Sequence, residues 1–405
     1  MRNNIKYGLR AWPLPLTVFA MVFLFQSCEK LVFVQELTNT DCVKIYLNQY
    51  SANIYAIDIK RSEEDGYFLF GLAGSYMESK FDATGDLYLT RVDEEGHQEW
   101  EEFYSIGSRK NSYPSNILKT DDNQYLMVWN DGPGHHYAVS LKPEHDPRQI
   151  QIKTLEMPEQ VHHLLFISQK IDPADGYIML AIGSREISDT TYRQLSILSA
   201  DTEFTGLEVL SVYEYDPAPI SGYIDNDLAF IEFIHHWLFL GHDGKRYFFN
   251  GPVGDRMALM YVGDNQYIYS HEEYLISNLI NLSDGTLDGL LQNPYSSGDE
   301  MYRVKELELS PVNQTFSDLS TIPFPPELQS LDPGANSFLL DSSLVGTLLS
   351  QQIIIYNGKE SEILGSTYPY EAAGICMDGN GNLMIVGTTR MHYLQQRMFM
   401  IKYRL

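Results

Sequence analysis

Residues 86–100 read DLYLTRVDEEGHQEW. Apolar and polar side chains alternate over residues 87–92, and this alternation predicts a β-strand with one buried face. The acidic, Gly-containing corner at 93–96 is typical of a tight turn, and the run after it, around Trp100, predicts a second, antiparallel strand. We interpret this hairpin as the clearest copy of a unit that is built several times along the chain.

A second kind of strand recurs along the chain, each time directly after a tight polar turn. Clear copies cover residues 66–71, 124–129, 176–181 and 382–387, and weaker copies cover 237–241, 286–291 and 344–349. These seven copies follow one another at roughly 40–60 residues, within the range expected of propeller repeats. Helical periodicity is almost absent, and the 28 Tyr and 19 Phe suit half-buried pleated sheets.

Flanking strands extend each copy to a unit of four antiparallel strands. The units are expected at residues 51–105, 113–157, 163–213, 225–270, 275–320, 335–365 and 370–405. The last unit ends one strand short, and a free edge there would be a template for aggregation. We therefore predict an all-β fold, a β-propeller of seven four-stranded blades closed by an N-terminal strand within residues 31–47.

A two-domain β-sandwich protein is the alternative architecture. It requires a linker near mid-chain, and the Pro-rich residues 321–334 are the candidate. Because the strand rhythm continues beyond them, we interpret these residues as a loop between blades.

The first 27 residues have the features of an export signal. Basic residues precede an apolar run at 11–25, which is too short and too interrupted by proline for a comfortable membrane span. The run ends in LFQSC at residues 24–28, which resembles a bacterial lipobox, where the thiol of the Cys is acylated before cleavage. We predict a lipoprotein signal peptide over 1–27, lipid attachment (palmitate or a similar acyl chain) at Cys28 followed by a tether and closing strand over 28–50, and the propeller over 51–405. An ordinary secretory signal with an incidental Cys is the alternative.

The repeat unit is similar to those of exported bacterial β-propeller lipoproteins. The shared pattern is Gly-Tyr, an apolar run and Gly, then a strand ending in Asp-x-x-Gly and Trp, and it is clearest over 57–103 and 374–405. The resemblance implies a lipid-anchored protein of the cell envelope, at the outer membrane. The corner at 93–100 also resembles that of quinoprotein propellers, but it lacks their extra Thr and does not recur in every blade, so no cofactor is predicted.

The charge of the chain excludes one class of partner. There are 28 Lys and Arg against 54 Asp and Glu, a net charge of −26. A surface this acidic repels phosphate, so nucleic acid is not an expected partner. Apart from Cys28 the chain has Cys42 and Cys376, which we expect in the outer and inner strands of the last blade, too far apart for a disulfide.

The longer connections, those between second and third strands and between blades, share one end of the predicted ring, which we call the long-loop face. Rigid scaffolds usually place recognition on such loops. Histidines and a basic, aromatic connection map to this region, and they give the candidate ligand-binding residues Arg109, Lys110, Tyr113, His136, His162 and His392. Paired histidines raise the alternative of a metal site, but neighbours in an extended chain point opposite ways, so no metal site is predicted.

No catalytic residue is predicted, because the sequence has no G-x-S-x-G, H-E-x-x-H or P-loop string. The sequence favours a non-enzymatic envelope lipoprotein whose propeller binds a protein or glycan on its long-loop face. The alternative is a propeller hydrolase or lyase acting on a polysaccharide, because 54 acidic residues make carboxylate pairs plentiful. A deep pocket with convergent carboxylates would favour the enzyme.

Overall fold

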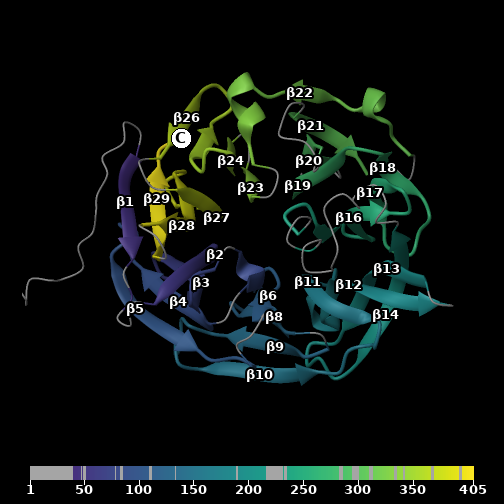
Figure 1. The fold of residues 1–405 in the computed structure, drawn as a ribbon, viewed down its shortest axis with the longest axis horizontal. Coiled ribbons are helices and arrows are strands. Elements are labelled where there is room, and N and C mark those ends of the chain that lie inside the picture. The colour runs from purple at the N-terminus through teal and green to yellow at the C-terminus, as the bar shows by residue number, and fades with distance from the viewer. Residues whose placement is uncertain are drawn as a thin grey trace, which may run out of the picture.

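The computed structural model describes most of the chain beyond its N-terminal segment. The described residues are 40–46, 48, 52–77, 79–82, 85–108, 112–132, 134–187, 190–215, 231, 235–281, 286–293, 301–309, 313–332, 335–340, 343–365, 369–391 and 395–405. Their strands form seven sheets arranged in a ring (Figure 1). The predicted seven-bladed β-propeller is therefore confirmed, and the two-domain alternative is wrong.

Each blade is an antiparallel sheet, and in blades 1–6 the strands run in chain order from the ring axis outward. Blade 1 is β2 (Asn53–Arg61), β3 (Tyr67–Gly74), β4 (Asp86–Val92) and β5 (Gln98–Tyr104); blade 2 is β6 (Ser112–Pro114) and β7 (Leu118–Lys119), then β8 (Tyr125–Asp131), β9 (His136–Leu141) and β10 (Ile150–Leu155); blade 3 is β11 (Val161–Gln169), β12 (Tyr177–Ile187), β13 (Thr190–Ala200) and β14 (Leu207–Tyr215). Blade 4 is β15 (Phe239–His242), β16 (Tyr247–Val253), β17 (Arg256–Tyr261) and β18 (Tyr267–His271); blade 5 is β19 (Leu275–Asn281), β20 (Thr286–Gln292), β21 (Met301–Glu308) and β22 (Thr321–Pro323). Blade 6 is β23 (Ser337–Leu340), β24 (Ser343–Thr347), β25 (Ile353–Tyr356) and β26 (Ser361–Leu364); blade 7 is β27 (Tyr370–Met377), β28 (Leu383–Arg390) and β29 (Gln396–Tyr403), completed by β1 (Thr40–Tyr46). The described helical elements are single short turns: η1 (Lys80–Asp82), η2 (Pro173–Asp175), η3 (Phe316–Asp318) and η4 (Pro326–Ser330).

The N-terminal strand closes the ring, as predicted. β1 pairs antiparallel with β29 and supplies the outer strand that blade 7 lacks. Tyr46 of β1 also donates a hydrogen bond from its hydroxyl to the carbonyl of Gly96, at 3.0 Å, in the corner of the opening hairpin. Gly96 has φ of 78°, a left-handed backbone conformation that favours glycine. Residues 31–39 of the predicted N-terminal strand region lie outside the described residues.

The two remaining cysteines lie in the strands where the sequence placed them. Cys42 is in the outermost strand of blade 7 and Cys376 is in the innermost strand, with β29 and β28 between them. Cys376 is a free cysteine, and its burial, together with the nearby Asp58, raises the pKa of the thiol to about 12. The thiol of Cys376 is therefore protonated and unreactive at neutral pH.

The hydrophobic core is divided among the seams between neighbouring blades. The buried apolar side chains of the described residues form seven clusters, and each is centred on the boundary between two adjacent sheets. The second strands contribute most, since β3 and β8 are buried along nearly their whole length. This explains why these strands gave continuous apolar runs in the sequence instead of an alternation.

Polar side chains of second strands form hydrogen bonds across four of the seams between blades. Asn130 of β8 accepts a hydrogen bond from the backbone amide of Leu164 and donates to its carbonyl, both at 2.8 Å, across the seam between blades 2 and 3. Single hydrogen bonds of the same kind join Asn250 to Ile276, Thr347 to Ala372 and Thr388 to Ala56. The last of these crosses the seam between blades 7 and 1, so side chains as well as β1 close the ring.

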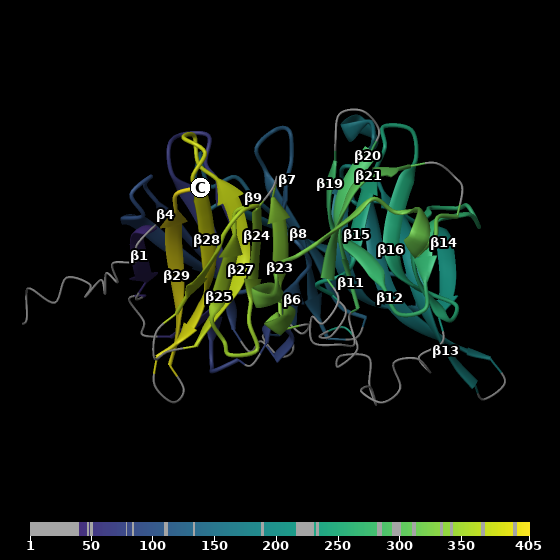
Figure 2. The same ribbon diagram turned by 90° about the horizontal axis from the view of Figure 1, so that it is seen from above.

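Two expected loops are partly regular structure. The connection between the second and third strands of blade 3 was expected among the longer loops, but β12 and β13 stay paired as far as Ile187 and Thr190, so this hairpin extends beyond the neighbouring blades (Figure 2). The Pro-rich residues 321–334 contain β22, the outer strand of blade 5, and η4, which leads toward blade 6. Both strands of the long hairpin have 11 residues, which the short apolar run in the sequence did not indicate.

Candidate functional site at the long-loop mouth of the central channel

The predicted ligand-binding residues fall into three groups in the structure. Arg109, Lys110 and His392 lie outside the described residues, so they stay predictions. His162 is half-buried near the start of β11. Tyr113 and His136, by contrast, have 1% and 0% of their surface exposed, so these two side chains are not available to a ligand in this structure.

Tyr113 and His136 instead help to hold blades 2 and 3 together. The hydroxyl of Tyr113 lies 2.6 Å from Nδ1 of His163, and burial raises the pKa of Tyr113 well above 10, so this hydroxyl is neutral at pH 7. Nδ1 of His136 lies 3.1 Å from Oδ1 of Asn130. Burial, with neighbouring histidines, lowers the pKa of His136 to about 4, so its ring is neutral at pH 7. We call Tyr113, Asn130, His136 and His163 the seam cluster.

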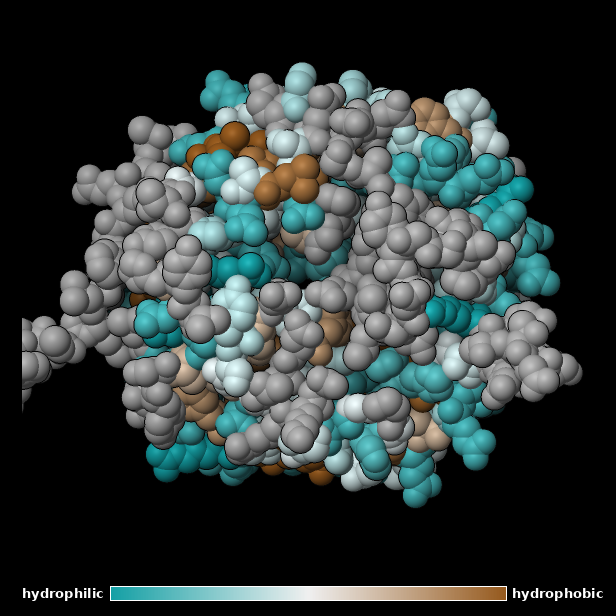
Figure 3. All heavy atoms as spheres, in the orientation of Figure 1, coloured by the Kyte–Doolittle hydropathy of each residue, from teal (hydrophilic) through white to brown (hydrophobic). Residues whose placement is uncertain are grey.

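A cavity of about 360 Å³ lies in the central channel, lined by the innermost strands of all seven blades. It is in the size range of small-molecule sites. Half-buried phenyl rings from three blades, Phe166, Phe239 and Phe338, line it together with polar side chains. The long-loop face around its mouth faces the viewer in Figure 3, and the described part of the outer rim is mostly hydrophilic.

β-bulges direct four residues into this cavity. Ile57 in β2, Leu165 in β11 and Ala373 in β27 are the extra residues where the register to the second strand shifts. Asn278 occupies the bulge in β19 and has φ of 50°, a left-handed conformation that a non-glycine residue rarely adopts. Strained backbone of this kind is often found at functional sites, and here it turns a polar amide toward the channel.

The connection between β3 and β4 brings a cation to the channel mouth. The backbone of Met77 in this connection pairs with the side-chain amide of Gln396: Met77 N donates to Oε1 at 2.8 Å, and Nε2 donates to Met77 O. Phe81 of η1 is buried against Tyr113 on one side and His235 on the other, with both ring centroids 4.6 Å away. These anchors place the neighbouring Lys80 in the wall of the cavity.

Lys80 places an ammonium group in the wall of the cavity, near its mouth. Burial lowers the pKa of its ammonium group to about 8, and the nearby Asp58 carboxylate opposes that shift. Among the described residues Lys80 Nζ makes no hydrogen bond or ion pair, and its contact is with the Phe81 ring at 5.1 Å from the centroid. Asp58 is instead paired with Lys60, at 2.8 Å. The chain is strongly acidic, yet the Lys80 ammonium group in its central cavity has no anionic partner within the described part of the chain.

Two histidines complete the mouth. His235 and His236, which precede β15, have ring centroids 3.6 Å apart, and both line the cavity. Nδ1 of His236 lies 2.6 Å from Oδ1 of Asn336, just before β23. We call Lys80, His235, His236, Asn278 and Asn336 the mouth cluster. Histidines at 235–236 were visible in the sequence, but nothing in their spacing related them to Lys80 or to residues 278 and 336.

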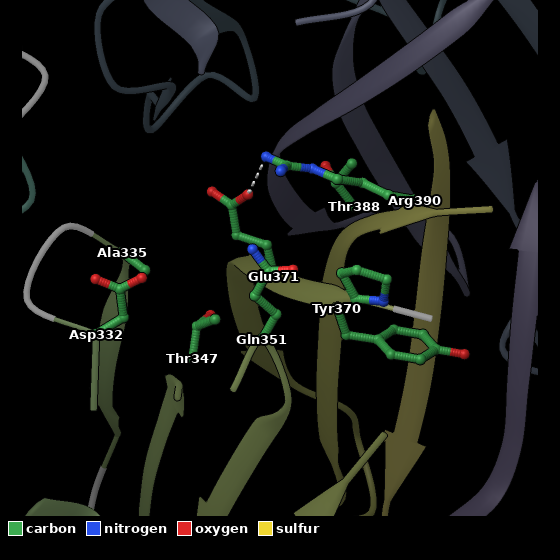
Figure 4. Close-up of a pocket in the computed structure, with 9 residues that line it drawn as sticks. Asp332, Ala335, Thr347, Gln351, Tyr370, Glu371, Thr388 and Arg390 are labelled. Atoms are coloured by element: carbon green, nitrogen blue, oxygen red, sulfur yellow. Dashed lines mark ion pairs between the residues drawn. The ribbon is translucent and has the colours of Figure 1, made fainter. Parts of the chain in front are cut away.

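A second, smaller cavity of about 160 Å³ opens between blades 6 and 7. Asp332 and Glu371 lie on opposite sides of it, and Arg390 pairs with Glu371 at 3.8 Å (Figure 4). Glu371 also accepts a hydrogen bond from Tyr55, at 2.6 Å. The ring of Tyr370 packs on Phe399 and points away from the cavity.

One group among the described residues has a spacing suitable for a metal ion: Asp93, Glu95 and His97, in the corner of the opening hairpin. Their ligand atoms lie within 4.8 Å of one another at the protein surface. Asp93 accepts hydrogen bonds from the backbone amide of His97, at 2.6 Å, and lies 2.9 Å from its Nδ1. These bonds are those of an ordinary turn, and they occupy the Asp93 carboxylate without a metal.

Comparison with known proteins places the chain by its fold. No protein-family model matches it, and no curated protein sequence matches it. Among solved structures, the acylaminoacyl peptidase of Pyrococcus horikoshii is similar to it at 12% identity over 86% of this chain and 51% of that chain, with a TM-score of 0.46. Sqt1 of Saccharomyces cerevisiae is similar at 9% identity, covering 88% of this chain and 86% of that chain (TM-score 0.45), and BamB of Moraxella catarrhalis at 8%, covering 92% and 98% (TM-score 0.42). The chain spans about half the length of the peptidase. At these identities the likeness is one of fold alone.

Proposed function

We propose that this chain is a non-enzymatic lipoprotein of the cell envelope whose propeller binds a protein or glycan partner on its long-loop face. The observation that carries the proposal is the channel cavity that opens at this face, with the mouth cluster at its rim. It combines apolar rings with a few polar groups from different blades, which is the usual composition of a recognition site. Arg109, Lys110, His162 and His392 stay candidate contacts around it.

The carboxylates of the cavity favour binding over catalysis. A glycosidase needs two carboxyl groups at a defined separation. Among the described residues that line the channel cavity, Asp58 is the one acidic side chain, and Lys60 pairs with it. The described lining of this cavity therefore does not supply the two carboxyl groups, one acid and one base, that a glycosidase uses.

Binding is tested with the full-length protein, purified in detergent, on a glycan array and in pulldown from envelope extracts. We expect capture of a defined partner that is lost when Phe81→Asp disrupts the anchor of the β3–β4 connection but kept with Ile152→Asp, a substitution on the outer strand β10. Phe81 is buried at the mouth, whereas 46% of the surface of Ile152 is exposed. Equal capture by both variants would rule out the long-loop face.

Lipid attachment at Cys28 is a separate part of the proposal, since Cys28 lies outside the described residues. No helix among the residues that the structure describes is long and apolar enough to span a membrane. Labelling cells with an alkyne fatty acid should mark the wild-type protein in the membrane fraction, and Cys28→Ser should lose the label and be released. Equal labelling of both proteins would contradict acylation at Cys28.

A polysaccharide hydrolase or lyase is the second candidate, and the smaller cavity is the observation that favours it. Asp332, Glu371 and Arg390 face one space there, and a carboxylate pair beside a cation is a feature of such enzymes (Figure 4). Release of reducing ends from a panel of polysaccharides, lost in Glu371→Gln and kept in Lys80→Gln, would favour this candidate over the first.

A further inference from the structure

We propose that the mouth cluster binds a carboxylate-bearing sugar residue, with the carboxylate at Lys80. This inference rests on the proposed binding role of the long-loop face and names the class of its ligand. On this proposal, a chain of acidic sugars inserts one of its residues into the channel cavity and is not bound at the outer rim.

The first argument is the distribution of charge. The protein has a net charge of −26, so an anionic ligand is repelled by most of its surface. Lys80 is a cation in the cavity wall with no hydrogen bond or ion pair among the described residues. A half-buried ammonium group without an anion is unfavourable, and a bound carboxylate would supply a charge-assisted hydrogen bond there.

The second argument is the pair of amides that face the same space from other blades. Asn278, from blade 5, uses its amide nitrogen in a contact with Ser277 Oγ at 3.4 Å, and its amide oxygen has no hydrogen-bond partner within the described part of the chain. Asn336, before blade 6, uses its amide oxygen for His236, and its amide nitrogen has none there. One free acceptor and one free donor match the hydroxyl groups of a sugar, which both donate and accept.

The third argument concerns shape. A cavity of about 360 Å³ holds one or two sugar rings but not a folded domain, and its phenyl rings offer flat apolar surfaces to the C–H face of a sugar. The strained backbone of Asn278 is also explained, because an unstrained strand would not turn this amide into the channel. A peptide carboxylate would satisfy Lys80 but would leave the two amides without matched partners, so it serves as an arm of the test.

The test is calorimetric titration of the full-length protein with trimers of galacturonate, glucuronate and mannuronate. The controls are the methyl esters of the same trimers, and a Gly-Gly-Phe tripeptide with a free or an amidated C-terminus. We expect at least one acid trimer to bind, and its methyl ester to bind at least about tenfold more weakly, the loss typical of a charge-assisted hydrogen bond.

Variants then locate the charge. Lys80→Gln should weaken binding of the acid trimer at least about tenfold without changing binding of the ester, and Lys80→Arg should retain most of the affinity. Lys142→Gln is the matched control, because it removes the same charge from an exposed pair with Asp122. Asn278→Gly keeps the left-handed backbone and removes the amide, so it should weaken the acid and the ester equally.

The pH dependence separates binding by Lys80 from a structural role. The charged groups near Lys80 are Asp58 and Lys60 on β2 and, across Phe81, His235 and His236. With its pKa near 8, Lys80 loses its proton between pH 7 and 9, so affinity for the acid trimer should fall roughly tenfold over that range. Lys80→Arg should abolish this fall, because guanidinium stays charged.

The proposal fails if no acid trimer binds, if acid and ester bind equally, or if Lys80→Gln binds like wild type. Binding of the free tripeptide in place of every sugar, with the same dependence on Lys80, would also overturn it. In these cases the pulldown and glycan-array result with Phe81→Asp still decides the proposed function by itself, so the two failures are distinguishable.

Discussion

Two asparagine–histidine pairs in this molecule have the same local chemistry and opposite surroundings. In the seam cluster, Oδ1 of Asn130 lies 3.1 Å from Nδ1 of His136, and in the mouth cluster Oδ1 of Asn336 lies 2.6 Å from Nδ1 of His236. The first pair is fully buried between blades, whereas the second is half-buried at a cavity. A pair of histidines in a sequence therefore indicates a ligand site only where polar groups beside it in the folded protein are left without hydrogen-bond partners.

Phe81 separates the two clusters. Its ring packs edge-on against Tyr113 of the seam cluster and against His235 of the mouth cluster. On the seam side, Tyr113 and His163 bond to each other. On the mouth side, Lys80 has no such bond in the described structure, so this side has binding capacity left for a ligand.

Both clusters require a closed ring of blades, and opening the ring should therefore have the largest effect on the stability of the protein. A chain that starts at Ser51 lacks β1, and so loses the ladder to β29 and the bond from Tyr46 to Gly96. Each hydrogen bond contributes about 0.5–1.5 kcal/mol, and an exposed β29 edge favours aggregation. We expect the chain from Ser51 to aggregate or melt far below a chain from Glu29 in thermal denaturation monitored by circular dichroism. The same melting temperature for both would show that β1 is only a tether.

Replacement of Asn130 or Asn336 by alanine tests directly whether burial distinguishes the two asparagine–histidine pairs. Asn130→Ala leaves the buried amide and carbonyl of Leu164 and Nδ1 of His136 without partners, and should lower the free energy of unfolding by about 3–5 kcal/mol. Asn336→Ala removes one half-exposed bond and should cost less than about 1 kcal/mol. Urea denaturation measures both values. A similar loss in the two variants would show that burial does not distinguish the pairs.

The burial of the seam cluster should also make the free energy of unfolding depend on pH, and this effect should be smaller than the two above. The pKa of His136 is about 4 in the folded protein against an ordinary value of 6.5, so the unfolded chain binds the proton more readily. The resulting stability is fully present above pH 6.5 and is lost as pH falls toward 4, by about 2–3 kcal/mol. His136→Gln should remove that part of the acid sensitivity in urea titrations at pH 7, 5.5 and 4.5. An unchanged slope in the variant would mean that other groups govern the acid sensitivity.

Much of the fold followed from patterns that are local in the chain. Turns with Gly, Asp and Asn precede apolar runs at nearly regular intervals, and each such pair forms two neighbouring strands regardless of the rest of the molecule. The missing strand of blade 7 could be inferred by counting. The long hairpin of β12 and β13 was not predicted, because its outer part pairs through residues such as Arg185 and Tyr192 that have no apolar pattern.

The sequence by itself determined the number of blades, their closure by an N-terminal strand and the acidic character of the body, because these depend on periodicity and composition. Only the tertiary structure decided which polar residues are free to bind. Tyr113 and His136 were predicted as ligand contacts, yet blade 3 covers them, whereas Lys80, Asn278 and Asn336 come from separate parts of the chain and meet only in the channel. Whether a polar group already has a partner depends on residues far away in the sequence, and this is why the seam cluster and the mouth cluster could not be told apart before the ring was closed.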